Sequence, residues 1–288
     1  MIGYIFFRVF TALFSILPFG AVYRISDFLA WVLYRVVKYR RKVVEQQLRM
    51  CFPERSAADL EVIAQKSYQN LSDIIVESIK GFSMSKEVFL ERYKFVNPEV
   101  ATKYTDHGQC VIQVAAHYGN WEWGVISYAL WFRSPSMGFY KPLSNKYTDK
   151  YAEIKRGRFG FILVSIANTS KAFEQYKNDP ATFVFVSDQS TSSDKAHWVN
   201  FFGQDTACPP GVDKYSRMLN CPVMFVDIQR VARGYYEVTL EELTDGTENL
   251  PEGALTERYM QKLETILKAK PEDWLWSHKR WKKKRLTT

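Results

Sequence analysis

The sequence predicts an α/β fold in which a mixed, largely parallel sheet is flanked by helices, behind an N-terminal membrane-anchoring helix. Three observations support this prediction. From residue 110 onward, short apolar runs rich in β-branched or aromatic residues alternate with amphipathic stretches. Such alternation is typical of the strand–helix–strand units that build parallel sheets. The composition, 47% hydrophobic and 16% aromatic, supplies a sizeable core, and the chain opens with a long apolar segment.

The first predicted element is the apolar segment Ile2–Tyr23, in which Arg8 is the only charged residue. It has about the length needed to cross a bilayer core of ~30 Å, although Arg8, Pro18 and Gly20 interrupt it. A second aromatic-rich stretch, Phe28–Val37, follows at helical spacing. We interpret the pair as a membrane anchor or as helices lying in the membrane interface. An ordinary buried helix is the alternative.

Two basic clusters follow from the charge pattern, one at residues 35–42 and one at 279–285. Together they carry eleven positive charges, more than the net charge of +8, so the rest of the chain is net negative. A nucleic-acid-binding protein is expected to carry a basic face through its folded body, so we expect no nucleic acid partner. The first cluster follows an apolar segment and the second is interleaved with tryptophans, which fits anionic membrane phospholipid. A solvated basic tail is the alternative.

The position of the first cluster also predicts topology. Because basic residues follow the apolar segment, the positive-inside rule places the body of the protein on the cytoplasmic side of the membrane. We expect an anchor over residues 1–42 and one further domain over 43–288, because the sequence contains no internal repeat and no long linker that would divide it.

The remaining elements follow in chain order. Residues 43–100 are predicted to be helical, because Leu71, Ile74, Ile75 and Ile79 form an apolar stripe at spacings of three and four. The strands expected after them are Cys110–Ala115, Met137–Lys141, Phe161–Ile166, Thr182–Val186, Val223–Arg230 and Tyr235–Leu240. The helices expected between and after them are Trp121–Phe132, Asn145–Arg158, Thr169–Asn178, Gly211–Leu219 and Leu255–Lys268.

The four cysteines contain no C-x-x-C pair and no pairing pattern with histidines. A disulfide framework or a zinc site is therefore not expected, no metal is predicted, and a reducing compartment fits best. We expect all four to be buried as small apolar side chains.

The chemistry-bearing stretch is Val114–Gly124, V-A-A-H-Y-G-N-W-E-W-G. His117 follows a predicted strand, at the end where open α/β sheets gather functional groups. Gly119 permits a sharp turn, Asn120 is a plausible N-cap, and Glu122 then falls in the first turn of the next helix. Curling of the chain could bring Glu122 to His117, where its carboxylate would fix the imidazole tautomer. A packed histidine beside a surface glutamate remains the alternative.

The sequence resembles the bacterial lipid A late acyltransferases, within the lysophospholipid acyltransferase superfamily. H-Y-G-N-W-E is similar to the family's His-x4-Glu/Asp signature, and five further blocks follow in the family's order. They are Y-K-P-L-S-N (Tyr140–Asn145, with Lys141 where arginine is usual), R-G-R-F-G (Arg156–Gly160), S-D-Q (Ser187–Gln189), N-F-F-G (Asn200–Gly203) and P-E-D-W-L-W-S-H-K-R-W-K (Pro271–Lys282).

The resemblance implies a glycerolipid acyltransferase-like fold and a role for each matching residue. It makes His117 the general base and Glu122 its orienting partner. Arg156 and Arg158 would meet phosphate on the donor or the acceptor, since arginine binds phosphate through its planar fork. Asp188 would position the acceptor or an arginine. Asn120 and Gly119 would shape the turn, and backbone N–H groups there could stabilise the oxyanion.

The function implied is O-acyl transfer from an acyl thioester, on acyl carrier protein or coenzyme A, to a hydroxyl of a lipid A precursor. No cofactor is expected, and the implied location is the cytoplasmic face of a bacterial inner membrane. An acyltransferase for another glycolipid, an aminolipid or a lysophospholipid is an alternative. A non-enzymatic peripheral lipid-binding protein is a further one, disfavoured because a carrier has no use for a general base.

Overall fold

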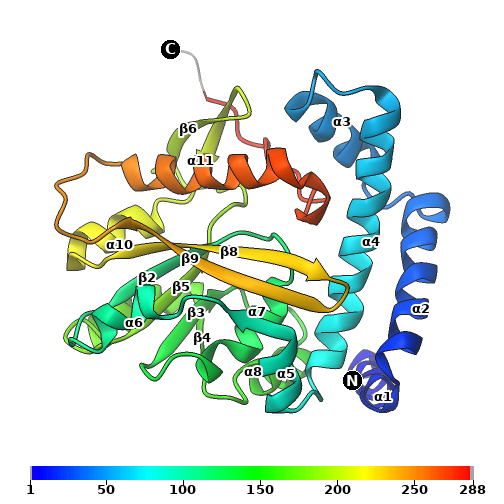
Figure 1. Cartoon of the computed structure of the whole chain (residues 1–288), viewed down its shortest axis with the longest axis horizontal. Coiled ribbons are helices and arrows are strands. Elements are labelled where there is room, and N and C mark those ends of the chain that lie inside the picture. The colour runs from blue at the N-terminus through cyan, green and yellow to red at the C-terminus, as the bar shows by residue number, and fades with distance from the viewer. Residues whose placement is uncertain (1, 286–288) are drawn as a thin grey trace.

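The structure is a computed structural model that describes residues 2–285. Its centre is a seven-stranded sheet in the order β1-β9-β8-β2-β5-β3-β4 (Figure 1). Every neighbouring pair is parallel except β8 and β9, which form a long antiparallel hairpin. The predicted mixed, largely parallel sheet is therefore confirmed. The strands are β1 (Tyr93–Phe95), β2 (Val111–Ala115), β3 (Ser136–Tyr140), β4 (Ile162–Ser165), β5 (Thr182–Val186), β8 (Val223–Ala232) and β9 (Tyr235–Thr244).

Helices cover both faces of this sheet because successive side chains of a strand point to opposite faces. On β2, Val111 and Ala115 pack in one apolar cluster with α5, α6 and α7, while Ile112 and Val114 pack in another with α9, α10 and α11. All five residues of β2 are buried. The covering helices are α5 (Lys86–Arg92), α6 (Glu99–Thr105), α7 (Trp121–Ser127), α8 (Lys146–Arg156), α9 (Thr169–Gln175), α10 (Gly211–Leu219) and α11 (Ala254–Ala269).

The N-terminal helices form a separate layer against the long helix α4 (Ala57–Gly81), at one side of the molecule in Figure 1. Proline at position 18 separates α1 (Ile2–Ile16) from α2 (Phe19–Trp31), and a π-helical turn, η1 (Val32–Val36), follows. None of the helices in residues 2–285 is both long and apolar enough to cross a bilayer. The expected anchor is thus not found as a spanning helix, because the apolar segment breaks into two short helices.

Three short strands were not expected. Residues 43–100 form α3 (Arg41–Cys51), α4 and α5 as predicted, but β1 then joins the sheet edge beside β9. The sequence predicted no strand between residues 186 and 223, yet β6 (His197–Phe201) and β7 (Gln204–Cys208) form a hairpin there. This hairpin packs on α11 rather than on the main sheet.

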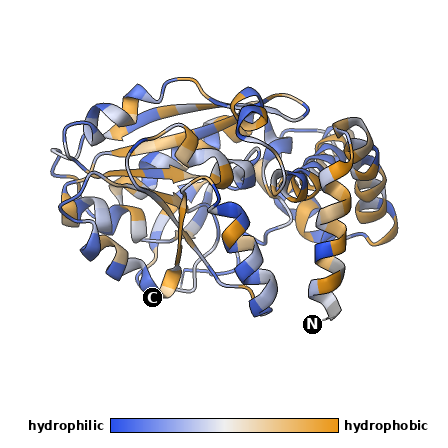
Figure 2. Cartoon of the chain, turned by 90° about the horizontal axis from the view of Figure 1, so that it is seen from below, coloured by the Kyte–Doolittle hydropathy of each residue, from blue (hydrophilic) through white to orange (hydrophobic). Residues whose placement is uncertain are grey.

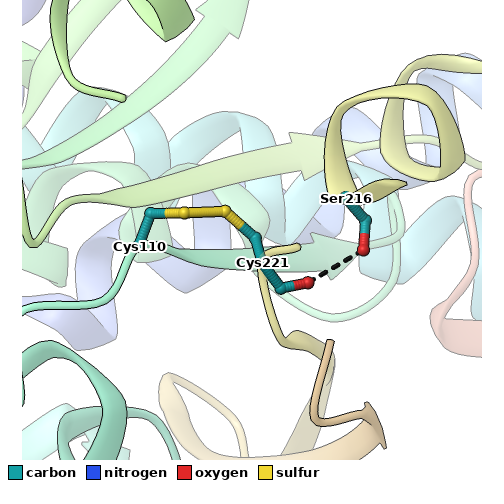
Figure 3. Close-up of a disulfide and its surroundings, with 3 residues drawn as sticks. All are labelled: Cys110, Ser216 and Cys221. Carbon is teal, nitrogen blue, oxygen red and sulfur yellow. Dashed lines mark hydrogen bonds between the residues drawn. A yellow bond between two sulfur atoms is a disulfide. The ribbon is translucent and has the colours of Figure 1, made fainter. Parts of the chain in front are cut away.

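The structure corrects the expectation for the cysteines. Cys110 and Cys221 form a disulfide with a Cα–Cα distance of 5.6 Å, and the Ser216 hydroxyl donates to the Cys221 carbonyl (Figure 3). The pairing follows from strand register, because Ile112 and Val223 are partners on the parallel strands β2 and β8, and each cysteine lies two residues before one of them. All four cysteines are buried, as expected, and Cys51 and Cys208 are free. Because two of the four cysteines form a disulfide, the cysteines do not support the expected reducing compartment.

Candidate active site

The turn that carries His117 joins the central strand β2 to helix α7. Gly119 adopts a φ of +61°, and a Cβ at this position would stand 2.6 Å from the Ile228 carbonyl oxygen. Only glycine can therefore make this turn so close to β8. Asn120 accepts the Trp123 N–H at 2.9 Å, which is the predicted N-cap of α7.

The carboxylate that contacts His117 is Asp188. The distance between His117 Nδ1 and Asp188 Oδ1 is 2.7 Å. Strand register explains the meeting, because Ala115 and Val186 are partners at the ends of β2 and β5, and each site residue lies two positions beyond. Asp188 is fully buried, whereas His117 keeps a partly exposed edge.

The Asp188 carboxylate is held in its ionised form. Burial by itself would raise its pKa, but His117 and the indole of Trp274 lower the pKa below its usual value. Trp274 Nε1 donates to Asp188 Oδ2 at 2.7 Å. Because the carboxylate accepts from Nδ1–H, the neutral His117 ring presents a lone pair on Nε2. Gln189 donates to this Nε2 at 3.2 Å.

The C-terminal segment fixes the backbone of the turn. The His117 carbonyl accepts the Leu275 N–H, and the Gly119 N–H donates to the Asp273 carbonyl, both at 3.0 Å. Tyr118 and Trp274 form an antiparallel bridge between these contacts. The Gly119 N–H is therefore occupied, and this donor is not free for the oxyanion as the sequence suggested.

Glu122 points away from this pair. It forms a bidentate ion pair with Arg156 at the end of α8, with N···O distances of 2.7 to 3.0 Å. The expected contact between Glu122 and His117 is thus replaced by two separate pairs, His117 with Asp188 and Glu122 with Arg156. The reason is local: α7 begins at Trp121, so Glu122 projects from its first turn toward α8 rather than back over the turn.

Arg158, the second residue predicted to bind phosphate, donates its hydrogen bonds to backbone carbonyls of the protein itself. Nη2 of Arg158 donates to the carbonyls of Gly81 and Met84, at the end of α4 and just beyond it. Burial lowers the pKa of Arg158. The structure therefore shows Arg158 holding two loop carbonyls, while Arg156 lies beside the turn that carries His117.

Sequence reasoning missed the buried residue that holds this turn from below. Glu77 on α4 accepts hydrogen bonds from Asn120 Nδ2 at 2.6 Å and from the hydroxyls of Tyr23 and Tyr236 at 2.8 Å. Burial raises the pKa of Glu77 to about 7. No pattern in the sequence marks this role, because Glu77 lies outside the apolar stripe of α4, on its polar side at helical spacing.

A narrow apolar pocket opens under α7 next to the pair. Trp121, whose ring lies edge-on to the His117 ring with 5.0 Å between centroids, forms part of its wall. The pocket runs between α7 and the sheet toward Tyr128 and Phe161. The wall is almost entirely apolar and includes Ala115, Val125, Val184, Val186, Val226 and Ile228.

Known proteins with similar sequences share one activity class. The profile of the bacterial lipid A biosynthesis acyltransferases matches residues 2–283. A lipid A biosynthesis acyltransferase of Haemophilus influenzae is 20% identical over 93% of this chain and 83% of its own length. The lipid A biosynthesis lauroyltransferase of Escherichia coli is 21% identical over 92% and 87%, and its palmitoleoyltransferase is 22% identical over 85% and 80%.

The family match spans nearly the whole chain, including the histidine turn, the S-D-Q segment and the C-terminal segment that the structure brings together. The chain is an acyltransferase and belongs to the bacterial lipid A biosynthesis acyltransferase family.

Proposed function

We propose that this protein transfers a fatty acyl group from a thioester, on acyl carrier protein or coenzyme A, to a hydroxyl of a lipid A precursor at the cytoplasmic face of the bacterial inner membrane. The observation that carries the proposal is the His117–Asp188 pair, in which Nε2 of a fixed tautomer faces a partly open site. The named activities of the relatives support the acceptor class.

In the proposed reaction, the acceptor hydroxyl displaces Gln189 and donates its hydrogen bond to His117 Nε2. As the hydroxyl oxygen attacks the thioester carbonyl, its proton moves to Nε2, and Asp188 stabilises the imidazolium that forms. The tetrahedral intermediate collapses with cleavage of the C–S bond, and His117 returns the proton to the leaving thiolate. The products are an ester and a free thiol.

The donor's acyl chain fits the apolar pocket under α7. The volume of the pocket is only about 30 Å³, which is too small for a fatty acyl chain. The half-buried side chains of Trp121 and Val125 must therefore move for a chain to enter. Arg156 remains the candidate for a donor phosphate, since it lies beside the site and Glu122 holds it there. Glu122 in this proposal positions Arg156, and Gly119 and Asn120 position His117.

Contact with the membrane is proposed through the N-terminal helices lying in the interface. Apolar residues are prominent along α1 and α2 in Figure 2, and several stay exposed: Val9 (63%), Ile16 (78%), Phe28 (65%) and Trp31 (55%). A large exposed apolar patch beside basic residues is typical of a membrane-binding surface. The basic residues at 35–42 then lie at the same surface.

Lipid mass spectrometry tests the acceptor. Cells lacking the gene should accumulate a lipid A lighter by one acyl group, and the wild-type gene should restore it. A change in a different glycolipid, an aminolipid or a lysophospholipid would move the proposal to that acceptor. Unchanged lipids in all classes would contradict it.

A further inference from the structure

A groove of about 300 Å³ lies between helix α4, the residues around η1 and the C-terminal segment. Its apolar wall comes from Leu33, Leu71 and Ile75. Its polar wall comes from Arg40 and His278. None of these five residues has a role in the reaction described above.

The groove is lined by the segment that holds the backbone of His117. Leu275, which also lines it, donates its N–H to the His117 carbonyl at 3.0 Å. His278 Nε2 accepts the N–H of Ser190 at 3.1 Å. The preceding residue, Gln189, contacts His117 Nε2. Two residues, Ser190 and Gln189, thus connect the wall of the groove at His278 to the proposed general base.

His278 presents a hydrogen-bond donor to this groove. Because Nε2 accepts a backbone N–H, the neutral ring carries its proton on Nδ1. Burial and the neighbouring Lys282 lower the pKa of His278 to about 4, so the ring is neutral at physiological pH. Within residues 2–285 no protein acceptor bonds to Nδ1.

The mouth of the groove is positively charged and surrounded by apolar residues. Arg40 and Lys38 are exposed, and neither forms an ion pair within residues 2–285. The only hydrogen bond of the Arg40 side chain there goes to the Ser277 carbonyl, at 3.1 Å. Val36 and Val37, which precede Lys38 in the chain, are both 59% exposed.

We propose that this groove binds the acceptor as a phosphorylated lipid, with its apolar part on Leu33, Leu71 and Ile75 and its phosphate at Arg40. His278 Nδ1–H then donates to an oxygen of the headgroup and directs the hydroxyl toward His117. This inference rests on the proposed acyl transfer. The arrangement separates the substrates, with the donor chain under α7 and the acceptor between α4, η1 and the C-terminal segment.

The direct test measures binding without turnover. In a His117→Ala background, a phosphorylated lipid A precursor in detergent micelles is compared with the same lipid after phosphatase treatment. Arg40→Gln should weaken binding of the phosphorylated lipid by about tenfold to a hundredfold, since a hydrogen bond to a charged group is lost. Binding of the dephosphorylated lipid should not change, and Arg40→Lys should recover part of the loss.

Arg133→Gln is the matched control, because it removes one exposed positive charge from the loop before β3, outside both the groove and the N-terminal layer. It should leave both affinities unchanged. If Arg40→Gln weakened binding of both lipids equally, or of neither, the proposal that the groove binds the phosphorylated acceptor would be wrong. It would also be wrong if Arg40→Gln weakened binding to phosphatidylglycerol micelles by the same factor, because the groove would then be a general phospholipid site.

A kinetic test uses His278→Leu in the enzyme with His117 intact. It should raise the KM for the acceptor and leave the KM for the donor thioester unchanged. If only the KM for the donor changed, the groove would bind the donor and not the acceptor, and the proposal would be wrong. If the wild-type enzyme acylates no lipid at all, the proposed function fails. If it does and the Arg40 and His278 variants match it, only the groove fails.

Discussion

The N-terminal layer and the turn around His117 are built in opposite ways. Among the residues that the structure describes, Phe14, Val22 and Val76 form the only fully buried apolar cluster between the first helices and α4, and several outer apolar side chains are exposed. In the turn, the backbone at His117 and Gly119 is bonded to the C-terminal segment, and the side chains of His117 and Asn120 have partners. The N-terminal layer thus exposes apolar surface that fits the proposed contact with a membrane, whereas the turn is held rigid, as the proposed base at His117 requires.

The largest effect is expected from removing the imidazole of His117, the proposed base in the rigid turn. His117→Ala should lower acyl transfer by roughly 10² to 10⁴-fold with little change in melting temperature, because a positioned base contributes that much. His107→Ala is the control, since His107 is an exposed histidine on the surface. Turnover of a radiolabelled acyl thioester and a melting curve on the same preparations provide the measurement. Normal turnover by folded His117→Ala would refute a catalytic role.

A second experiment compares the two carboxylates. Asp188→Asn keeps the size but cannot accept Nδ1–H as an ion, so it should approach the loss of His117→Ala, and the double variant should be little worse. Glu122→Gln removes a partly exposed ion pair with Arg156 and should cost about 1 kcal/mol of stability or less, with a smaller loss of rate. A more severe rate loss in well-folded Glu122→Gln would restore Glu122 as the orienting residue.

The pocket under α7 predicts a smaller, selective effect. A Cβ on Gly124 would stand 2.7 Å from the Tyr93 hydroxyl, so Gly124→Ala should push that ring into the pocket. Rates with the longest acyl thioesters should fall roughly tenfold relative to short ones. Gly211→Ala, in α10 and outside the pocket, is the matched control and should keep the profile. An unchanged chain-length profile in Gly124→Ala would place the acyl chain elsewhere.

The N-terminal layer is tested by flotation on anionic liposomes. Phe28→Ser with Trp31→Ser should reduce binding at every salt concentration, because buried apolar area is insensitive to screening. Neutralising Lys282, Lys284 and Arg285 should reduce binding only at low salt, since each exposed basic residue near the surface contributes about 1 kcal/mol. Equal flotation of the double serine variant and the wild type would exclude this surface.

The smallest effect concerns pH. The pKa of His278 is lowered to about 4 in the folded state, against 6.5 ordinarily. Between these values the unfolded chain binds more protons, so stability rises with pH across this window and falls as the pH drops from about 6.5 toward 4. Urea unfolding at several pH values should show a flatter profile for His278→Gln than for the wild type. An identical slope would mean that His278 titrates normally in the folded protein.

Local pattern predicted most of the fold. The strands at residues 110–115, 182–186 and 223–230 form close to their expected bounds, because continuous apolar runs bounded by turn signals indicate buried parallel strands. The short edge strand β1 and the hairpin of β6 and β7 were missed. Both are held by distant pairing or packing, which leaves little local signature.

The site was predicted in part. His117, the glycine turn and the Asn120 cap could be read from one stretch of sequence. The partner of His117 could not, because Asp188 reaches it only through the register of β2 and β5, 71 residues apart in sequence. The disulfide has the same origin, since Cys110 and Cys221 meet through the register of β2 and β8. Register is a property of the assembled sheet, and no spacing within the chain encodes it.

The bridge between Tyr118 and Trp274 sets the order in which the site can assemble during synthesis. The turn, the Asp188 segment and the tryptophan segment leave the ribosome in that order. Domains fold as units once their chain is available. A nascent or truncated chain that lacks Trp274 therefore has no indole to hold Asp188 and no strand partner for Tyr118. The arrangement around His117 is complete only after Trp274 has left the ribosome.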